Sequence, residues 1–514
     1  MMDIDYDVLV VGGGINGVAA ARDAAGRGAR VMLVEKDDLA NHTSSASSKL
    51  IHGGLRYLEY FEFRLVAEAL AERERLISSA PHLIRPLQFV VPYDRQSRPA
   101  WMIRLGLFLY DRIGGRRRLP GSARVKLGGI GLGAGLQSRF GFGFSYWDCF
   151  GDDSRLVVAN AMDARERGAI VLTRTRLVSA RRAGAFWTAS LEDCRTGEPR
   201  TVTARTLVNA TGCWAGMFLS DVLGMSRSVP LRLVRGSHIV TRRLSPAEHA
   251  FVLQNADGRI VFVIPYLGNL TLIGTTDVVS DGEPDQVHVD PSEVSYLCDI
   301  SNQFMAEKIT PEDVIWSFAG LRPLYEDEDK SPSAMSRDYV LDLDGDSGSA
   351  PVLSVFGGKI TTHRALAENA LDQLGPYLPR MGPAWTGTST LPGGDIANGD
   401  LPAFTRELAR QADFLPQATV ERWARSYGTR ALEILGDARS LAALGEDFGA
   451  GLTEVEVDYL VAKEWALTAD DILWRRSKLG LFVSGDAHNR LSKYLDRAMP
   501  ISTIARASIA VSRA

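Results

Sequence analysis

The chain contains no long hydrophobic run. A membrane-spanning helix needs about eighteen or more consecutive apolar residues, and no stretch of the 514 residues reaches that length. The nearest candidate, 260–276, includes a proline, an asparagine and two glycines, and its pattern predicts two strands around a turn at 267–269. We therefore expect no membrane span and, at most, a superficial contact with lipid.

Cysteine is also scarce. The four cysteines, Cys149, Cys194, Cys213 and Cys298, lie far apart and form no C-x-x-C pair, which argues against a zinc site, a disulfide framework or a thioredoxin-like motif. The N-terminal segment 1–7 is acidic and leads directly into an apolar strand, a pattern typical of neither a signal peptide nor a transit peptide. These features predict a reducing, cytoplasmic environment and no bound metal.

An excess of charge of one sign is missing as well. The formal net charge is −4, so the chain as a whole lacks the basic character of a nucleic-acid-binding protein. Its 45% hydrophobic and 23% charged residues are ordinary for a soluble globular protein. The length allows roughly two to four domains. We expect a folded, multidomain protein with no nucleic-acid partner.

Glycine, in contrast, is concentrated near the start of the chain. An apolar run at 8–11 leads into Gly12, Gly14 and Gly17, which have the G-x-G-x-x-G spacing, and then into an alanine-rich segment. This order predicts a strand, a tight turn and a helix whose N-terminus faces an anion such as a pyrophosphate. A lone glycine motif is weak support for a nucleotide site.

A second apolar run strengthens the nucleotide interpretation. Residues 31–34 end in Glu35, about twenty residues past the glycines, where an acid normally holds a ribose hydroxyl. An acid at this position favours a dinucleotide with a free 2′-hydroxyl, such as FAD or NAD. The segment 206–209 is a further strand pattern that ends in Ala-Thr-Gly, with Thr211 and Gly212. By itself it is equally typical of an ordinary strand-to-turn junction.

The later part of the chain predicts two more domains. An apolar strand at 352–356 is followed by Gly357 and a helix at about 363–374, so the nucleotide-binding domain is assembled from early, middle and late segments. The alternating pattern around 259–264 favours a mixed or antiparallel sheet in a second domain. Beyond a linker at 391–399, periodic apolar positions in runs such as 455–465 and 470–482 predict a helical domain.

A serine-rich segment, 43–57, separates the second strand from a helical pattern at about 58–78. Serine-rich stretches are usually flexible linkers, which is one interpretation here. The other is functional, because hydroxyl and amide groups at the start of a helix can bind phosphate oxygens.

Taken together, these segments resemble one family, the aerobic, FAD-dependent glycerol-3-phosphate dehydrogenases, over nearly the whole chain. Ile360 and His363 stand where many relatives have Leu and Tyr. The motifs that carry the resemblance are Gly12-Gly13-Gly14-Ile15-Asn16-Gly17, the segment 44–59, Gly236-Ser237-His238-Ile239-Val240, Leu321-Arg322-Pro323-Leu324, Ser336-Arg337-Asp338-Tyr339, Gly357-Gly358-Lys359-Ile360-Thr361-Thr362 and Gly445-Glu446-Asp447-Phe448-Gly449.

The resemblance implies an α/β fold with three domains. These are a Rossmann-like FAD-binding domain of the two-dinucleotide-fold flavoprotein type (1–75, 150–225 and 340–390), a mixed or antiparallel-sheet substrate domain (76–149 and 226–339) and an all-helical C-terminal domain (391–514). The cofactor-binding residues implied by the same motifs are Gly12, Gly14, Gly17, Glu35, Lys36, Ser44, Ser45, Ser48, Lys49, Thr211, Gly212, Gly357 and Thr361.

The implied substrate, sn-glycerol 3-phosphate, is a secondary alcohol that carries a phosphate dianion. Arg56 and Tyr57 are expected to hold the phosphate, the arginine through bidentate charge-assisted hydrogen bonds and the tyrosine as a neutral donor. Arg337 and Lys359 are further candidates for this role. Alternatively, Arg337 could pair with its neighbour Asp338.

Three residues are expected to carry the chemistry. His238 is the candidate general base, because imidazole titrates near neutral pH, and Arg322 would stabilise the developing alkoxide. Lys359 is grouped with them as a catalytic residue. The roles within this set could be exchanged. Each residue also has a structural alternative: His238 as an ordinary histidine of an apolar strand, Arg322 as the ion-pair partner of Glu326, and Lys359 as a solvated side chain.

The resemblance thus implies oxidation of sn-glycerol 3-phosphate to dihydroxyacetone phosphate, with electrons passed to a membrane quinone. The alternatives are an oxidase that uses oxygen, an amine or amino-acid oxidase of the same fold, and a non-enzymatic nucleotide-binding protein. A quinone acceptor implies peripheral association with the inner face of the cytoplasmic membrane, and the segment 101–118 has the arginines and aromatics to contact anionic lipid. Taken by itself, this segment is more typical of a packed helix followed by a solvated charged loop. A homodimer is compatible with the sequence.

Overall fold

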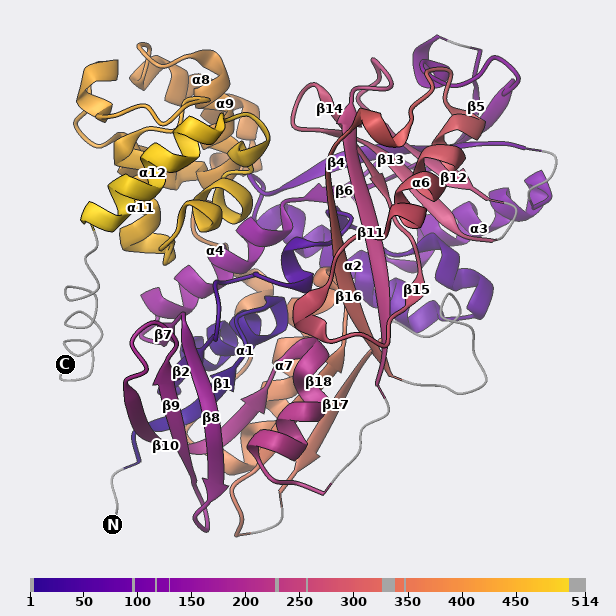
Figure 1. Ribbon diagram of the computed structural model, residues 1–514. Coiled ribbons are helices and arrows are strands. Elements are labelled where there is room, and N and C mark those ends of the chain that lie inside the picture. Colours follow the sequence, from indigo (N-terminus) through magenta and orange to yellow (C-terminus); the bar gives the residue numbers. More distant parts are fainter. Residues whose placement is uncertain are drawn as a thin grey trace.

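The computed structural model describes residues 4–94, 98–115, 118–128, 130–226, 231–255, 258–325, 338–345 and 348–498. Within them the chain forms two large sheets and a helical C-terminal lobe, which projects to one side of the molecule (Figure 1). The chain crosses between the sheets several times, so each sheet collects segments that are far apart in the sequence.

Sheet A has eight strands and contains the N-terminal strand at its centre. β1 (Tyr6–Val11) lies between β2 (Val31–Val34) and β10 (Pro199–Asn209) and runs parallel to both. Strands covered on both faces are expected to be continuously apolar, as the fully buried β2 is. The other strands are β7 (Ile170–Leu172), β8 (Thr175–Arg182), β9 (Trp187–Asp193), β17 (Tyr339–Asp344) and β18 (Val352–Gly357).

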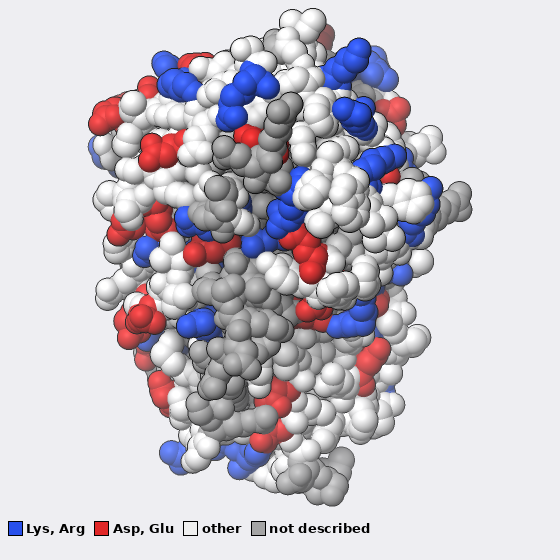
Figure 2. All heavy atoms as spheres, turned by 90° about the vertical axis from the view of Figure 1, so that its right-hand side faces the viewer, with Lys and Arg blue, Asp and Glu red and all other residues white. Residues whose placement is uncertain are grey.

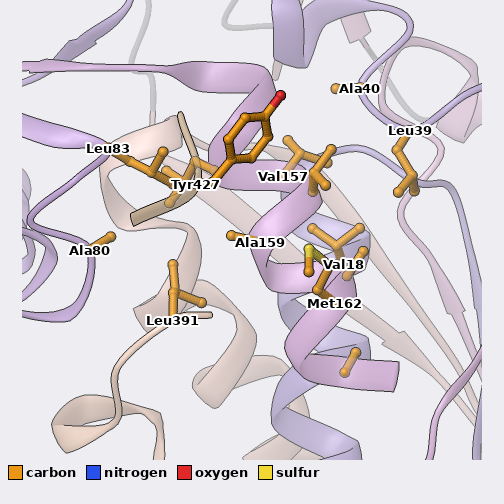
Figure 3. Close-up of a cluster of buried hydrophobic side chains, with 14 of the residues drawn as sticks. Val18, Leu39, Ala40, Ala80, Leu83, Val157, Ala159, Met162, Leu391 and Tyr427 are labelled. Carbon is orange, nitrogen blue, oxygen red and sulfur yellow. The ribbon is translucent and has the colours of Figure 1, made fainter. Parts of the chain in front are cut away.

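Three helices form the core beside sheet A. α1 (Ile15–Gly26) packs against α4 (Asp153–Glu166) and α7 (His363–Leu374). The alanines and glycines of α1 permit this close approach because they add little bulk at the contact. Figure 3 shows Val18 of α1 beside Met162 of α4 in a cluster of buried side chains that extends to Tyr427 of the C-terminal lobe. The lobe therefore shares a hydrophobic core with the nucleotide-binding part.

Sheet B has ten strands and is almost entirely antiparallel. Its longest pairing joins β11 (Leu231–Arg242) to β16 (Val314–Tyr325), and β11 also pairs with β14 (Leu270–Gly274). The remaining strands are β3 (Leu50–Ile51), β4 (Ile84–Pro92), β5 (Ala123–Lys126), β6 (Phe142–Gly151), β12 (Ala250–Gln254), β13 (Ile260–Tyr266) and β15 (Val278–Val279). The helices of this part are α2 (Phe63–Ser79), α3 (Ala100–Ile113) and α6 (Pro291–Phe304).

The C-terminal lobe is helical, as the sequence predicts. Its helices are α8 (Leu401–Gln411), α9 (Gln417–Tyr427), α10 (Ala431–Leu435), α11 (Glu454–Glu464), the π-helical η14 (Asp471–Arg476), the 3-10 helix η15 (Leu479–Leu481) and α12 (Gly485–Ala498). A buried ion pair fixes the lobe to the body, because Arg155 Nη2 of α4 donates to Glu464 Oε1 over 2.8 Å.

The two strands around the 267–269 turn, the strand at 31–34 and the helix at 363–374 are confirmed. Two predicted helices are interrupted. The helix expected from residue 58 begins at Phe63, because Phe61 adopts a left-handed conformation with φ 58° after a short 3-10 helix, Leu55–Tyr60. The helical pattern at 470–482 is divided by Lys478, whose φ is 60°.

The domain boundaries stay a prediction, with one difference at 50–51. This segment, expected in the nucleotide-binding domain, pairs with β6 in sheet B because the serine-rich segment leads from one sheet to the other. No helix in the described ranges is both long and apolar enough to cross a membrane.

Candidate active site

The turn between β1 and α1 can accommodate only glycine at two positions. Gly12 has a φ of +112°, and a Cβ there would lie 2.5 Å from the carbonyl oxygen of Ala210. A Cβ on Gly17 would overlap the carbonyl oxygen of Gly12. These contacts explain the glycine spacing by the close packing of helix, turn and neighbouring strand.

The N-cap residue of α1, Gly14, has no side chain that could cap the helix. Instead, the backbone N–H of Ile15 donates to Ser44 Oγ over 3.0 Å. Serine from the serine-rich segment thus lies at the positive end of α1, where backbone N–H groups attract an anion.

Glu35 is fixed at the end of β2. Its Oε2 accepts a hydrogen bond from Gly13 N over 2.6 Å, and its Oε1 accepts one from Asp37 N over 2.8 Å. Burial raises the pKa of Glu35, while the two N–H groups act in the opposite direction. The neighbouring Lys36 is paired with Asp285 over 2.6 Å and lies 4.3 Å from the ring centroid of Trp214.

The middle and late segments meet the glycine turn at the same edge of sheet A. Thr211 Oγ1 donates to Asn209 Oδ1 over 2.7 Å, and Gly212 follows with a φ of +60°. Gly357 has a φ of +72°, and its carbonyl accepts a hydrogen bond from Asn16 Nδ2 over 3.2 Å. The carboxyl ends of parallel strands form the usual ligand crevice of such sheets.

The serine-rich segment is a packed loop and not a flexible linker. Thr43 Oγ1 donates to the carbonyl of Leu321 over 2.7 Å, and Ser45 Oγ donates to the carbonyl of His42 over 3.2 Å. A Cβ on Gly320 would lie 2.9 Å from Ala46 Cβ. The loop therefore rests directly on β16 of sheet B.

Lys49 is buried, and its backbone is left-handed with a φ of 57°. Its ammonium group lies 2.8 Å and 2.9 Å from the two carboxylate oxygens of Asp153. The same carboxylate accepts a hydrogen bond from Ser47 Oγ over 2.7 Å. The observed partner of Lys49 is thus a carboxylate of α4, and its role in cofactor binding stays a prediction.

His238 lies on β11 and is only 1% exposed. Its Nε2 is 2.8 Å from Ser48 Oγ, and its ring stacks on Phe318 with a centroid distance of 4.9 Å and an interplanar angle of 8°. Burial, with contributions from the cations Arg322 and Lys49, holds the pKa of His238 well below its usual range. The imidazole is therefore neutral at physiological pH, with a lone pair on one of its two ring nitrogens.

Arg322 extends from β16 across the face of β11. Its Nη1 donates to Asp277 Oδ1 over 2.9 Å, and its Nη2 donates to Thr275 Oγ1 over 2.9 Å. A side chain on Gly236 would overlap the guanidinium group. The predicted alternative partner, Glu326, lies outside the described residues.

Tyr57 and Lys359 lie together although they are 302 positions apart in the sequence. The Lys359 ammonium is 3.8 Å from the centroid of the Tyr57 ring. Arg56 Nη2 donates to the hydroxyl of Tyr60 over 3.4 Å, and its buried Nε has no hydrogen-bond partner in the described part of the chain. Arg337 lies outside the described residues.

Further contacts connect these groups. The carbonyl of Pro323, next to Arg322, is 3.5 Å from the position of a Cβ on Gly357, so the end of β16 adjoins the turn that carries Lys359. The N–H of His52 donates to Thr361 Oγ1 over 3.2 Å, which links the loop before Arg56 to the same turn. The structure thus brings residues from four parts of the sequence to one region beside the glycine turn.

The residues present fit FAD. Gly12, Gly13 and Gly14 present no side chain at the N-terminus of α1, where such turns bind a pyrophosphate, and the buried Glu35 lies where a ribose is held. A carboxylate at this position accepts hydrogen bonds from a ribose 2′-hydroxyl and disfavours a 2′-phosphate.

Sequence reasoning missed several partners of the predicted residues. Phe318, Gly320 and Arg322 alternate along one strand, and alternate residues of a strand share a face. That period could have identified Phe318 as a neighbour of the site. Thr275 and Asp277, in contrast, follow β14 in an irregular segment, where the sequence has no periodic signal.

One cluster has the residue types of a metal site. Potential ligand atoms of Asp37, His42 and Asp285 lie within 4.8 Å of one another. His42 Nε2, however, contacts Asp37 Oδ2 over 2.8 Å, and Asp285 pairs with Lys36. The Asp37–His42 contact and the Lys36–Asp285 ion pair account for the cluster.

Comparisons with known proteins agree with this architecture. Residues 7–364 match the family model described as FAD dependent oxidoreductase, and residues 384–499 match the model described as C-terminal domain of alpha-glycerophosphate oxidase. The chain is thus a member of the FAD-dependent oxidoreductase class, and FAD is its cofactor.

More specific relatives are found over the whole length. The chain is 52% identical to a glycerol-3-phosphate dehydrogenase of Pseudomonas aeruginosa, covering 96% of each chain. It is 48% identical to the aerobic glycerol-3-phosphate dehydrogenase of Escherichia coli, covering 95% of this chain and 97% of the relative. It is also 48% identical to a D-erythritol 1-phosphate dehydrogenase of Brucella abortus, covering 96% of this chain and 98% of the relative.

The fold resembles that of a glycerol-3-phosphate dehydrogenase from Bacillus halodurans solved in complex with FAD. The TM-score is 0.72 at 24% identity, over 96% of this chain and 94% of that chain. From its sequence relatives, the chain belongs to the FAD-dependent glycerol-3-phosphate dehydrogenase family, as the motifs of the sequence predict.

Proposed function

We propose that this protein oxidises sn-glycerol 3-phosphate to dihydroxyacetone phosphate. The proposal depends on one observation: the neutral, buried His238 and several cationic side chains lie beside the β1–α1 glycine turn, which is suited to bind FAD. The names of the sequence relatives from Pseudomonas aeruginosa and Escherichia coli support the same substrate. When bound, FAD supplies the acceptor for the hydride that leaves C2.

The proton of the C2 hydroxyl is taken up at His238. Nδ1 of this ring is buried, and Nε2 faces Ser48 Oγ at 2.8 Å, so the proton reaches Nε2 through the serine hydroxyl. A neutral imidazole is needed at this step because imidazolium cannot accept a proton. Ser48, which we predicted as a cofactor ligand, thus has a proposed second role as a proton relay.

The cations bind and orient the phosphate-bearing substrate. Arg56 and Tyr57 donate hydrogen bonds to phosphate oxygens. The ammonium group of Lys359, which lies against the Tyr57 ring, is the third phosphate-binding group. Arg322, fixed by Thr275 and Asp277, stabilises negative charge on the C2 oxygen.

Substrate choice is tested by comparing three alcohols. The purified holoenzyme is mixed anaerobically with sn-glycerol 3-phosphate, D-erythritol 1-phosphate and glycerol, and the rate of flavin bleaching is measured. We expect the highest kcat/KM for sn-glycerol 3-phosphate and very slow reduction by glycerol, which lacks the phosphate. Faster flavin reduction by D-erythritol 1-phosphate would contradict the proposal and indicate the substrate that the name of the Brucella relative gives.

The electron acceptor is proposed to be a membrane quinone, with an oxygen-using oxidase as the second candidate. Exposed apolar side chains along α3 support access to a lipid-soluble acceptor. The test compares anaerobic turnover with a soluble quinone analogue against peroxide formation in air. Stoichiometric peroxide together with no quinone reduction would favour the oxidase.

The surface proposed to contact lipid lies on α3. Ile103 and Leu107 face the core, whereas Trp101, Leu105 and Phe108 are 67%, 49% and 42% exposed. Figure 2 views the molecule from the side on which α3 lies in Figure 1, and Lys and Arg side chains are scattered among uncharged ones over the upper part of this face. Exposed aromatics with nearby arginines are typical of interfacial helices.

This contact is tested with vesicles. Wild-type holoenzyme and the double variant W101S/F108S are sedimented with vesicles of neutral and of anionic lipid. We expect the wild type to bind anionic vesicles and the variant to lose most of that binding while keeping its flavin. Equal binding by both proteins would exclude α3 as the contact.

A further inference from the structure

The C-terminal lobe reaches the back of the serine-rich loop. Lys478 follows η14, is buried, and its ammonium contacts the hydroxyl of Ser154 at the start of α4. The same ammonium lies 3.6 Å from Asp152 Oδ1 and 3.9 Å from Asp153 Oδ1. A cation from the lobe is thus placed beside the carboxylate that binds the loop.

Asp153 connects the lobe to the loop. It is fully buried, and its oxygens accept hydrogen bonds from the ammonium of Lys49 and from the hydroxyl and the backbone N–H of Ser47. Lys49 also donates to the carbonyl of Ser45 over 3.1 Å. Both sides of Ser48, the residue that contacts His238, are therefore anchored to one carboxylate.

The lobe holds the loop at a second point. Arg476 donates from Nη1 and Nη2 to the two oxygens of Asp38, over 2.7 Å and 2.8 Å, and Arg475 Nε donates to Asp38 over 2.5 Å. Asp38 is buried and precedes the serine-rich segment. Trp474 stacks on Trp316 of β16 with a centroid distance of 4.9 Å.

Between these two anchors the loop is not packed against the lobe. A cavity of about 330 Å³ is lined by Thr43, Ser45 and Ala46 of the loop and by Trp474, Arg475 and Lys478 of the lobe. Close packing would fix the loop by many small contacts. Beside the cavity, the loop is instead fixed to the lobe by the ion pairs at Asp38 and Asp153.

From this arrangement we propose that Lys478 is a positioning residue for the active site. By neutralising Asp153 together with Lys49, it holds the loop in the conformation that places the Ser48 hydroxyl on His238 Nε2. The cluster holds two buried ammonium groups, Lys49 and Lys478, and two carboxylates, the buried Asp153 and the partly exposed Asp152. Removing one partner of a buried charge cluster leaves the remaining charges poorly compensated, which favours rearrangement. The catalytic part of this inference rests on the proposed function.

Hydrogen exchange of the holoenzyme tests the structural part directly. In Lys478→Met we expect peptides covering 41–50 to exchange about fivefold faster or more, since loss of the anchor lowers the free energy of local opening. Lys478→Arg, which keeps the charge, should restore most of the protection. If Lys478→Met fails to fold, Ser154→Ala replaces it in the experiment. This variant removes only the hydroxyl that Lys478 contacts, and we expect it to speed exchange at 41–50 by a smaller factor.

The matched control is Arg422→Met. Arg422 also belongs to a buried ion pair of the lobe, donating to Glu456 Oε2 over 2.7 Å, but that pair lies within the lobe. We expect faster exchange around 451–460 in this variant and unchanged exchange at 41–50. Faster exchange at 41–50 in Arg422→Met would show that any destabilisation of the lobe is enough to release the loop. That result would overturn the specific role of Lys478.

Kinetics test the catalytic consequence. The rate of flavin reduction by sn-glycerol 3-phosphate should fall about tenfold in Lys478→Met with little change in KM, because the phosphate-binding residues lie elsewhere. An unchanged reduction rate together with unchanged loop exchange overturns the inference. If the wild-type flavin is not reduced by this substrate, the proposed function fails, whereas the exchange experiment still tests the anchor.

Discussion

At the scale of single residues, the position of His238 on β11 determines the burial and the protonation state of its imidazole. Position on β11 buries the ring against Phe318, and the missing Cβ of Gly274 leaves space for it. Burial and nearby cations disfavour imidazolium. Ser48 then supplies a hydroxyl at the nitrogen that accepts the proton.

Replacing His238 by Ala should preserve the bound flavin and slow its reduction by about a hundredfold or more, which is the usual contribution of a general base. Ser48→Ala should slow the same step by about tenfold, because water can replace a lost hydroxyl relay. Anaerobic stopped-flow absorbance measures both rates. If His238→Ala is reduced as fast as the parent enzyme, another residue is the base.

Arg56→Ala should raise the KM for sn-glycerol 3-phosphate by about tenfold to a hundredfold, since a hydrogen bond to a charged group contributes about 1.5–3 kcal/mol. Its weak contact with Tyr60 leaves the guanidinium available for phosphate. Steady-state kinetics with sn-glycerol 3-phosphate and with glycerol check the assignment. An equal loss against both alcohols would contradict phosphate binding by Arg56.

Residue identities predicted much of the candidate site but not its internal contacts. The glycines and Glu35 could be recognised because their spacing along the chain reflects one local turn. The proximity of Tyr57 and Lys359 comes from the folding of distant segments, and single-sequence patterns do not report such contacts. Lys49 shows the same limit, since its partner Asp153 lies 104 residues later.

At the scale of elements, the β1–α1 turn is the part that local sequence specifies most completely. Its strand, glycines and helix agree with the structure because every required conformation is local. The helical patterns around Phe61 and Lys478 were less reliable. Each contains one left-handed residue that interrupts the helix, and periodicity does not detect a single reversed φ.

The turn gives an element-scale prediction. Gly17→Ala should abolish or severely weaken FAD binding, because the added methyl group would overlap the Gly12 carbonyl and displace α1 from the turn. Gly106→Ala on α3 is the control, since nothing lies within 4 Å of a Cβ there. The ratio of flavin to protein absorbance after purification reports the outcome. Full flavin content in Gly17→Ala would refute the close-packing argument.

At the scale of the whole molecule, several buried histidines couple stability to pH. Burial, as the main cause, lowers the pKa of His82 to about 3 and that of His363 to about 4. In the unfolded chain both groups have ordinary pKa values near 6.5. The unfolded state therefore binds more protons below that pH, and stability falls as the pH decreases from about 6.5 toward the folded-state values.

Each of these histidines should reduce the free energy of unfolding by roughly 2 kcal/mol between pH 7 and pH 5. Denaturant unfolding of the holoprotein at the two pH values measures the change. His363→Gln should show a smaller loss than the wild type, because glutamine does not titrate. The same loss in the variant would assign the pH dependence to other groups.

The assembly of the domains is only partly visible in the sequence. A discontinuous nucleotide-binding domain could be inferred because three strand-and-glycine signals recur along the chain. The lobe was recognised as helical, yet its ion pairs with Asp38 and Asp153 involve side chains more than 300 residues apart. Such pairs follow from the final packing and have no local signature.

Anaerobic mixing of the purified holoenzyme with sn-glycerol 3-phosphate tests the central claim most directly, because it measures substrate and flavin chemistry without any second acceptor. The account predicts that the yellow flavin absorbance bleaches rapidly and that dihydroxyacetone phosphate appears in an amount equal to the reduced flavin. A flavin that stays oxidised with this substrate, while dithionite still reduces it, would contradict the account.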